Sequence, residues 1–435
     1  MSNKPSLVFC GPVTTRSGYG EHSRDLLTSL FKMNKYDIKV ISINWGDTPM
    51  NALDATDQEH KQILDNIIPG LTSQPDVWVQ CTIPNEFQNV GKYNIGITAG
   101  IETDTCSGEW IEGCNKMNLV IVPSKHAKDV LLNTKYEKRD KRTNQPISNI
   151  EITVPIEVLH EGVRTDVFNK SLPPVVSMSE TLNSIPEEFC YLFVGHWLKG
   201  DFTQDRKDLS GLIYTFLETF GDTPNPPALL LKASSGGFSI TDRSRTLDKI
   251  DLIKKMCKKK SLPNIYLLHG DLTDLEMNTL YNHTKVKALV SFTKGEGYGR
   301  PIAEFITSGK PVIVSGWSGH VDFVNPVFHT YLDGELKQVH QSAVWEGVIN
   351  KESSWFNVNY NKASETLKDC FKNYKKYLYN ANKSVNEMET RWSYTAMLKK
   401  FDEMLELYLP KFSEKVSLKL PTLKKLPSLK KVETE

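Results

Sequence analysis

The sequence predicts an α/β protein made of two domains, each with a parallel sheet covered by helices. Three observations lead to this prediction. The chain has 435 residues, roughly two to three times the length of an ordinary domain. Hydrophobic residues make up 39% of the chain and charged residues 24%, which is enough apolar material for compact cores. Short apolar segments also alternate with helical ones, as they do in parallel sheets.

The first series of predicted strands begins near the amino terminus. Its β-branched and apolar runs, bounded by Gly, Pro, Asn or Asp, lie at residues 7–10, 38–43, 76–80 and 119–122. Helices are expected at residues 21–31 and 125–132. Apolar strands combined with amphipathic helices indicate a parallel sheet that is buried on both faces.

A second series of the same kind begins at residue 190. Its strands are expected at residues 190–194, 229–231, 265–268, 287–291 and 311–314, and its helices at 209–220 and 247–260. Before it, residues 169–188 contain three prolines and a Ser/Thr-rich stretch, which is typical of a linker. We therefore place a boundary near residue 172, between an N-terminal domain (1–172) and a C-terminal domain (173–386).

The end of the chain is expected to form a helix followed by a basic tail. Helical spacing of apolar side chains over residues 387–409 predicts one long closing helix, assigned to 387–410. Residues 411–435 are rich in Lys and contain Leu-Pro pairs, so they are expected to form a mobile tail without a core.

Charge, cysteine content and hydropathy exclude several classes of protein. The 53 Lys+Arg and 52 Asp+Glu leave a net charge of +1, so no general attraction to polyanions is expected. The first apolar run is too short for a signal peptide, and no segment approaches the ~20 apolar residues of a membrane span. Seven scattered cysteines without a Cys-x-x-Cys pair favour free thiols in a reducing compartment. We therefore expect a cytoplasmic protein that binds no metal.

A glycine-rich turn follows the first predicted strand. Gly11, Gly18 and Gly20 lie in the sequence GPVTTRSGYG, which leads into the predicted helix at 21–31. Backbone N–H groups in such a turn can approach an anion or a sugar hydroxyl. The spacing matches neither the dinucleotide fingerprint nor a Walker loop, so an ordinary turn between strand and helix is an equally good interpretation.

A more specific motif, KGEGYGRPIAE, occupies residues 294–304. Pro301 suits the first position of a helix, expected at 301–308, which places Glu296 in the preceding loop and Glu304 in the first helical turns. Free N–H groups at residues 297–300 can bind a diphosphate, and a carboxylate can accept two hydrogen bonds from the vicinal diol of a ribose or hexose. The segment is therefore predicted to bind a ligand.

This motif resembles the Glu-x7-Glu motif of retaining GT-B glycosyltransferases of family 4. The resemblance covers most of the chain, through residues 18–20, 101–104, 122–124, 161–168, 194–195 and 205–209. It implies two facing Rossmann-like domains with a deep cleft between them and a C-terminal helix that crosses back to the N-terminal domain. These expectations agree with the organisation predicted from the residues.

The resemblance also implies roles for the matching residues. Arg206 and Lys207 would neutralise the leaving diphosphate, and Glu296 would hold hydroxyls of the donor sugar. Glu304 would bind the nucleotide ribose, and Glu102 would lie near the reacting sugar. The remaining donor-binding residues implied are Gly18, Tyr19, Gly20, Gly297, Tyr298, Gly299 and Arg300.

The chain departs from the family pattern after the first strand of the second domain. Family members commonly have Gly-Arg at this point, whereas this chain has Gly195 and His196. Its dibasic pair comes later, after an insertion at residues 197–204.

The resulting prediction is a retaining glycosyltransferase that transfers a sugar from a UDP-, GDP- or ADP-sugar to a hydroxyl of a glycan, a protein or a lipid-linked glycan. No permanently bound cofactor is expected. The sequence contains no Asp-x-Asp, so the prediction requires no divalent ion at the diphosphate.

Three other functions stay open at this point. They are transfer of a sugar to a modified DNA base, the reaction of a sugar-nucleotide epimerase or phosphorylase of the same fold, and the role of an inactive sugar-nucleotide-binding subunit. The basic segments 125–142 and 254–260 could contact nucleic acid or a charged membrane surface, although such segments are more often solvated faces.

Overall fold

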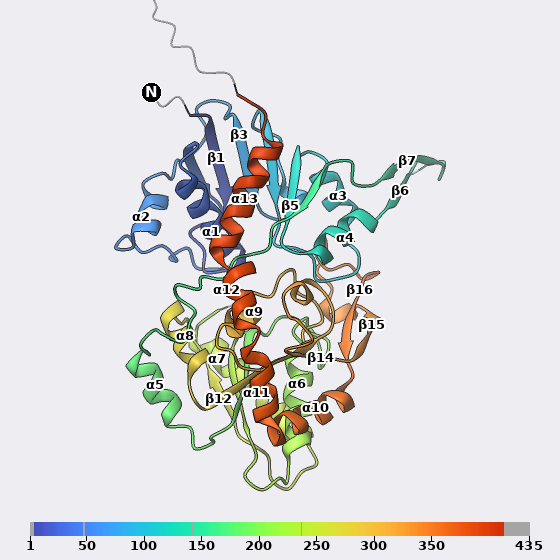
Figure 1. The fold of residues 1–435 in the computed structure, drawn as a ribbon. Helices are drawn as coiled ribbons and strands as arrows, with labels where there is room; N and C mark the ends of the chain where they lie inside the picture. Colours follow the sequence, from blue (N-terminus) through green and yellow to red (C-terminus); the bar gives the residue numbers. More distant parts are fainter. Residues whose placement is uncertain (1–3, 47, 141, 236, 413–435) are drawn as a thin grey trace, which may run out of the picture.

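The computed structural model describes residues 4–46, 48–140, 142–235 and 237–412. Two six-stranded parallel sheets, each flanked by helices, form two lobes that lie one above the other in Figure 1. This confirms the predicted α/β class with two sheets. The basic tail predicted at residues 411–435 falls outside the described residues, apart from its first two positions.

The first lobe is built on a sheet with the strand order β2-β1-β3-β4-β5-β8. All neighbouring strands in this sheet run parallel. The strands are β1 (Ser6–Gly11), β2 (Asp37–Ser42), β3 (Val77–Cys81), β4 (Tyr93–Ile97), β5 (Leu119–Val122) and β8 (Ile156–Val158). The helices of this lobe are α1 (Gly18–Met33), α2 (Gln58–Leu64), α3 (Gly108–Cys114) and α4 (Lys125–Asn133).

The second lobe has the strand order β11-β10-β9-β12-β13-β14. Counted from β9, this is the 3-2-1-4-5-6 order of dinucleotide-binding domains. The strands are β9 (Cys190–His196), β10 (Ala228–Ser234), β11 (Ile265–Leu268), β12 (Val286–Ser291), β13 (Val312–Ser315) and β14 (Thr330–Leu332). The helices are α5 (Val176–Asn183), α6 (Leu209–Phe220), α7 (Ile240–Met256), α8 (Asp274–Asn282), α9 (Arg300–Ile306), α10 (Tyr360–Lys372) and α11 (Tyr374–Asn382).

Two antiparallel hairpins are added to these lobes. The hairpin of β6 (Tyr136–Arg139) and β7 (Pro146–Ile150) projects from the first lobe, as Figure 1 shows. The hairpin of β15 (Gly334–Gln338) and β16 (Ser354–Val358) lies beside the second lobe, on the side that faces the first. Neither hairpin was predicted from the sequence.

The end of the chain returns to the first lobe, as predicted, but through two helices instead of one. Helix α12 (Val385–Arg391) ends before Trp392, and α13 (Tyr394–Tyr408) begins with Ser393 as its N-cap. At this break the chain pairs with Val163, whose N–H donates to the carbonyl of Trp392 at 2.9 Å. Apolar side chains of α13, including Phe401, are buried in the core of the first sheet. The prediction of one continuous helix was wrong because the N-cap and this backbone pairing restart the helix.

All nine predicted strands are present, with ends shifted by up to three residues. The largest shift among the helices is in α7, which was predicted at 247–260 and lies at Ile240–Met256, so Lys258 to Lys260 follow the helix. Strand β4 was missed because Asn94 and Gly96 interrupt its apolar pattern. A side chain at Gly96 would overlap the ring of Phe87, with 2.5 Å to its nearest carbon, so this glycine is needed for packing. None of the helices in the described part of the chain has the length and apolar character that crossing a bilayer requires.

Candidate functional site

The strand order of the second lobe brings two predicted motifs together. Strands β9 and β12 are neighbours at the point where the order reverses, and ligands of open parallel sheets bind there, beyond the carboxyl ends of the strands. Beyond β9 the chain reaches Arg206 and Lys207, and beyond β12 it reaches Glu296. Positions about 90 residues apart in sequence therefore meet at one edge of the sheet.

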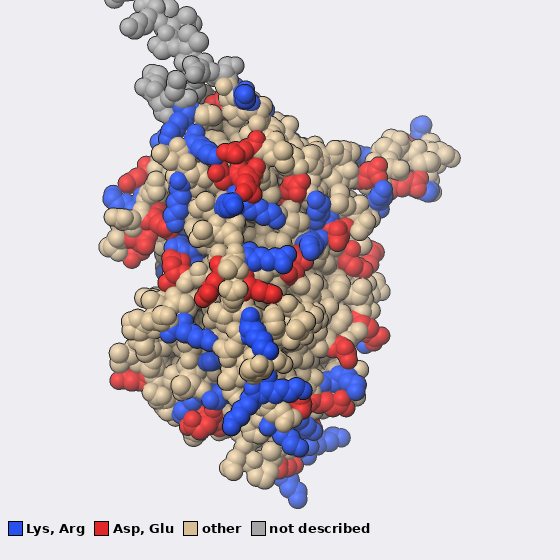
Figure 2. All heavy atoms as spheres, viewed as in Figure 1, with Lys and Arg blue, Asp and Glu red and all other residues tan. Residues whose placement is uncertain are grey.

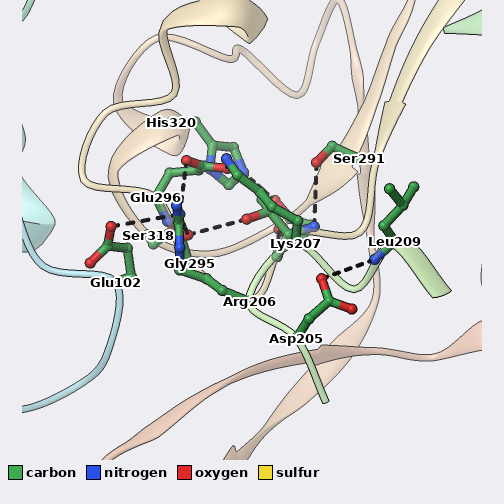
Figure 3. A network of polar contacts seen from close by, with 12 residues as sticks. Glu102, Asp205, Arg206, Lys207, Leu209, Ser291, Gly295, Glu296, Ser318 and His320 are labelled. Atoms are coloured by element: carbon green, nitrogen blue, oxygen red, sulfur yellow. Dashed lines mark hydrogen bonds and ion pairs between the residues drawn. The ribbon is translucent and has the colours of Figure 1, made fainter. Parts of the chain in front are cut away.

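The dibasic pair and Glu296 are in direct contact, as Figure 3 shows. The Lys207 ammonium is bonded to Oε1 of Glu296, and Nη1 of Arg206 lies 3.4 Å from Oε2 of the same carboxylate. Arg206 also donates to the carbonyl oxygen of Gly295 at 3.0 Å. Only 8% of the Glu296 side chain is exposed, so its carboxylate is nearly shielded from solvent and lies against the two cations.

These contacts determine the charge state of Glu296. Burial by itself would raise its pKa, but Lys207 and then Arg206 outweigh burial and lower the pKa to about 2. Burial lowers the pKa of Lys207, an effect that Glu296 opposes. Near neutral pH, Glu296 is therefore a fixed anion that can only accept hydrogen bonds.

A second ion pair, buried more deeply, contacts the loop that carries the dibasic pair and the loop that carries Glu296. Lys294 and Asp208 are fully buried, with 3.6 Å between Nζ and Oδ2. Asp208 accepts a further hydrogen bond at 2.7 Å from the hydroxyl of Tyr360, and the backbone N–H of Lys294 donates to the carbonyl of Arg206 at 2.8 Å. This pair fixes the position of the dibasic pair relative to Glu296.

The first lobe contributes Glu102 from the loop that follows β4. Its Oε1 lies 3.6 Å from Nη1 of Arg206, so a carboxylate from each lobe faces this guanidinium. Burial raises the pKa of Glu102, an effect that Arg206 opposes. The structure therefore brings together all four residues that the resemblance identified as catalytic: Glu102, Arg206, Lys207 and Glu296.

Glycines allow the loops of the two lobes to touch above this cluster. A Cβ at Gly297 would lie 2.0 Å from the carbonyl oxygen of Ala99, and one at Gly295 would lie 2.0 Å from that of Glu102. A Cβ at Gly100, which has a φ of +109°, would lie 2.7 Å from the Cα of Gly297. Any side chain at these positions would separate the lobes.

The predicted glycine-rich turn is partly helical. Helix α1 begins at Gly18 with Ser17 as its N-cap, so Gly18, Tyr19 and Gly20 form its first turn instead of a loop before it. The hydroxyl of Tyr19 lies 2.9 Å from that of Thr98, which directly precedes the loop that touches Gly297. This turn is thus close to the contact between the lobes.

The second glutamate of the motif lies in a different cluster. Glu304 accepts a hydrogen bond from the hydroxyl of Tyr281 at 3.2 Å and lies 3.6 Å from Nε of Arg300. Burial, and then the carboxylate of Glu21, raise the pKa of Glu304. The helix that carries Glu304 is α9, whose N-cap is Gly299 with φ +103.

Arg300 joins the two lobes. Its Nη1 lies 2.7 Å from Asp25 and 3.4 Å from Glu161, and its Nη2 lies 3.5 Å from Glu21, all on the side of the first lobe. The structure therefore places Arg300 among carboxylates instead of beside Arg206. The side chain of Tyr298 is buried in the core of the second lobe, so this residue can contribute to a ligand site only through its backbone.

Two histidines near the cluster were not predicted as site residues. His320 is fully buried; its Nε2 lies 2.7 Å from the carbonyl of Ser315, and its Nδ1 has no partner in the described part of the chain. The ring of His126, from the first lobe, lies edge-on to Trp317 with 4.6 Å between ring centroids. Burial, and then His320, lower the pKa of His126 to about 4. No sequence spacing links these two imidazoles.

Several basic side chains of the segments predicted from sequence pair with acidic neighbours. In residues 125–142, Lys135 lies 2.8 Å from Glu151 and Lys138 lies 3.6 Å from Glu112. Figure 2 shows Lys and Arg interspersed with Asp and Glu over the visible face of the upper lobe. Within the described ranges, no group of three or more His, Cys, Asp and Glu side chains is arranged to hold a metal ion.

Solved structures share the fold of this chain. A glycosyltransferase from Rickettsia africae matches with a TM-score of 0.59 and 14% identity, covering 96% of this chain and 100% of that one. HepE of Anabaena in complex with UDP-glucose matches with a TM-score of 0.60 and 12% identity, covering 93% and 100%. Sucrose-phosphate synthase from Thermosynechococcus elongatus matches with a TM-score of 0.60 and 11% identity, covering 93% and 99%.

These likenesses confirm that the chain has the predicted GT-B fold, with two Rossmann-like lobes. No protein-family model matches the sequence. The comparison with curated proteins also finds no match.

Proposed function

We propose that this protein is a retaining glycosyltransferase of the family 4 type, which transfers a sugar from a nucleotide diphosphate sugar to an acceptor hydroxyl. The observation that carries the proposal is the contact of Arg206 and Lys207 with Glu296 at the switch point of a dinucleotide-type sheet. Because HepE has been solved with UDP-glucose, this compound is the first donor to test. The proposed reaction requires no metal ion.

In the proposed reaction, the dibasic pair stabilises the leaving group. The bond between the anomeric carbon and the phosphate oxygen breaks, and a bond from the acceptor oxygen to the same face of the anomeric carbon forms. Negative charge develops on the departing diphosphate, where fixed cations lower the barrier most effectively. The departing phosphate oxygen takes the acceptor proton, so no side chain has to act as a base.

The carboxylates have a different task. Glu296, held ionised by Lys207, accepts hydrogen bonds from hydroxyls of the donor sugar, and Glu304 binds the ribose. Glu102 approaches the reacting sugar from the first lobe. Closure of the lobes through Gly297 excludes water and so limits hydrolysis of the donor.

The domains divide the substrates in this proposal. Residues 1–172 bind mainly the acceptor and residues 173–386 the donor, and residues 387–410 connect the second domain back to the first. The first turn of α1, residues 18–20, lies where the first lobe closes on the donor phosphates.

The test combines binding with product analysis. A thermal-shift panel of UDP-, GDP- and ADP-sugars identifies the donor, and mass spectrometry then follows transfer to glycan, protein, lipid and DNA acceptors. We expect Arg206→Ala with Lys207→Ala to lower transfer by at least about 100-fold while the protein stays folded. The matched control is Lys375→Ala with Lys376→Ala, an exposed dibasic pair on α11, which should keep full activity.

Each alternative function gives a different result in this test. Consumption of donor without transfer to an organic acceptor identifies an epimerase, and cleavage that depends on phosphate identifies a phosphorylase. Donor binding without turnover identifies an inactive subunit. Full transfer by the Arg206 and Lys207 double variant contradicts the proposed roles of the two cations.

A further inference from the structure

A cavity of about 970 Å³ lies beside the candidate site, between the β15–β16 hairpin and the segment that leads to the dibasic pair. This volume is near the upper end of the range for pockets that hold small ligands, so it exceeds the need of a single sugar unit. Most of its lining residues carry polar side chains. They include Gln204 on one side and Glu335, Lys337, Gln338, Glu352 and Asn357 on the hairpin side.

The charges in the cavity are balanced locally. Lys337 lies 3.0 Å from Glu335, and Lys351 lies 3.5 Å from Glu352. Each lysine of the lining thus already faces a carboxylate, and Asp333 adds a further negative charge. A phosphate or sulfate would have to compete with these carboxylates, whereas a neutral polyol can use both members of each pair as hydrogen-bond partners.

The cavity shares its walls with the loops of the candidate site. Asn357, which lines the cavity, accepts a hydrogen bond from the buried ammonium of Lys294, two residues before Glu296. On the opposite wall, Gln204 lies two residues before Arg206. Two segments that carry residues of the proposed reaction centre therefore also contribute to the cavity wall or contact it.

The hairpin is also attached to the first lobe, close to Glu102. The N–H of Asp104 donates to the carbonyl of Ser354 at 2.9 Å, and the N–H of Ser354 donates to the Asp104 carboxylate at 2.6 Å. These two hydrogen bonds attach the start of β16 to Asp104, which lies two residues after Glu102 in the sequence. The hairpin that forms part of the cavity wall is thus fastened to the loop that carries Glu102.

The last two residues of the insertion at 197–204, where the chain departs from the family pattern, line the cavity. The N–H of Asp201 donates to the hydroxyl of Ser342 at 2.9 Å, and the Lys199 ammonium lies 3.4 Å from the carbonyl of Val344. The insertion is therefore fastened to the segment between β15 and β16. This explains structurally what the extra residues before Arg206 do.

We propose that this cavity binds a neutral oligosaccharide portion of the acceptor. The inference rests on the proposed function, because it assigns the acceptor side of the same reaction. Part of the acceptor specificity then lies in the second lobe, in the β15–β16 hairpin and the 197–204 insertion.

A glycan microarray of short neutral oligosaccharides, with sulfated and sialylated counterparts, tests the proposal on the full chain without a donor. We expect the wild type to bind neutral glycans. Two variants should weaken this binding by about tenfold or more, the first through the loss of hydrogen bonds to charged groups and the second through steric exclusion of the glycan. They are Glu335→Ala with Lys337→Ala, which keeps the net charge, and Gln338→Trp, which fills the cavity.

The matched control removes an ion pair outside the cavity. Lys362→Ala with Glu365→Ala eliminates an exposed pair at 2.9 Å on α10 and should leave glycan binding unchanged. The inference is overturned if the wild type binds no neutral glycan or prefers the anionic glycans. It is also overturned if both cavity variants bind neutral glycans as tightly as the wild type does. Thermal stabilisation of the wild type by UDP-glucose is measured in parallel. Absence of donor binding would contradict the proposed function, whereas absence of glycan binding would contradict the glycan site.

Discussion

The substitution Lys207→Met tests the electrostatic account of the site. Lys207 is the largest of the influences that lower the pKa of Glu296 from 4.5 to about 2, a difference that corresponds to about 3 kcal/mol of stabilisation. Burial of the Lys207 ammonium offsets part of this gain, and Arg206 remains in the variant. We therefore expect the free energy of unfolding at neutral pH to fall by about 1–2 kcal/mol.

The stability difference between the wild type and Lys207→Met should depend on pH. Glu296 has a lowered pKa in the folded state, so its stabilising contribution is complete above about pH 4.5 and is lost as the pH falls toward 2. Between about pH 6 and about pH 3.5 the wild type should lose about 1 kcal/mol through this group. In Lys207→Met the pKa of Glu296 is closer to its value in the unfolded chain, so most of this loss disappears. The free energies of unfolding of the two proteins therefore become more similar in acid.

Urea denaturation at a series of pH values measures both effects, and donor turnover measures the catalytic one. We expect kcat/KM to fall by about 100- to 1,000-fold, as when a charge-stabilising donor is removed. The control is Lys310→Met, which removes a half-buried lysine outside the Lys207 cluster, whose ammonium donates hydrogen bonds to two backbone carbonyls at 2.7 Å each. A difference in stability between the wild type and Lys207→Met that is the same at pH 6 and pH 3.5 refutes the reasoning.

Three further substitutions test other parts of the structure. Gly297→Ala places a methyl group against the carbonyl of Ala99 and pushes the lobes apart, so transfer should fall at least about tenfold and the unfolding midpoint should also fall. Lys310 has a pKa lowered to about 7 by burial, so wild-type stability should rise between about pH 7 and pH 10, and denaturation of Lys310→Met should lack this rise. Arg300→Met leaves its carboxylate partners facing one another, so calorimetry should show a loss of about 3–5 kcal/mol that shrinks in acid.

Much of the fold was predictable because its strands are buried on both faces. In β9 and β10 nearly every side chain is apolar, and such runs stand out against polar loops. Strand β8 has only three residues and was missed for that reason. The β15–β16 hairpin was missed because its first strand, Gly334–Gln338, is exposed along its whole length and carries no apolar periodicity.

The prediction of the site was limited by what a local motif contains. The Glu296 motif identified its loop, and the resemblance supplied Arg206, Lys207 and Glu102, which the structure then brought into contact. Nothing in the sequence indicated that Arg300 would face carboxylates of the first lobe. The contact depends on how the two lobes meet, which is a property of tertiary packing and not of spacing along the chain.

The charges of the cluster indicate how donor binding and lobe closure would be linked. Arg206 and Lys207 face Glu296 and Glu102, so two cations meet two carboxylates in this cluster. A diphosphate would add negative charge and compete with Glu296 for Lys207, which releases that carboxylate toward sugar hydroxyls. A nucleotide diphosphate without the donor sugar would displace Glu296 but bring none of the donor-sugar hydroxyls from which this carboxylate would accept hydrogen bonds. The complete donor should therefore stabilise the closed lobes more than its nucleotide diphosphate alone, which a thermal-shift comparison of UDP with UDP-glucose would reveal.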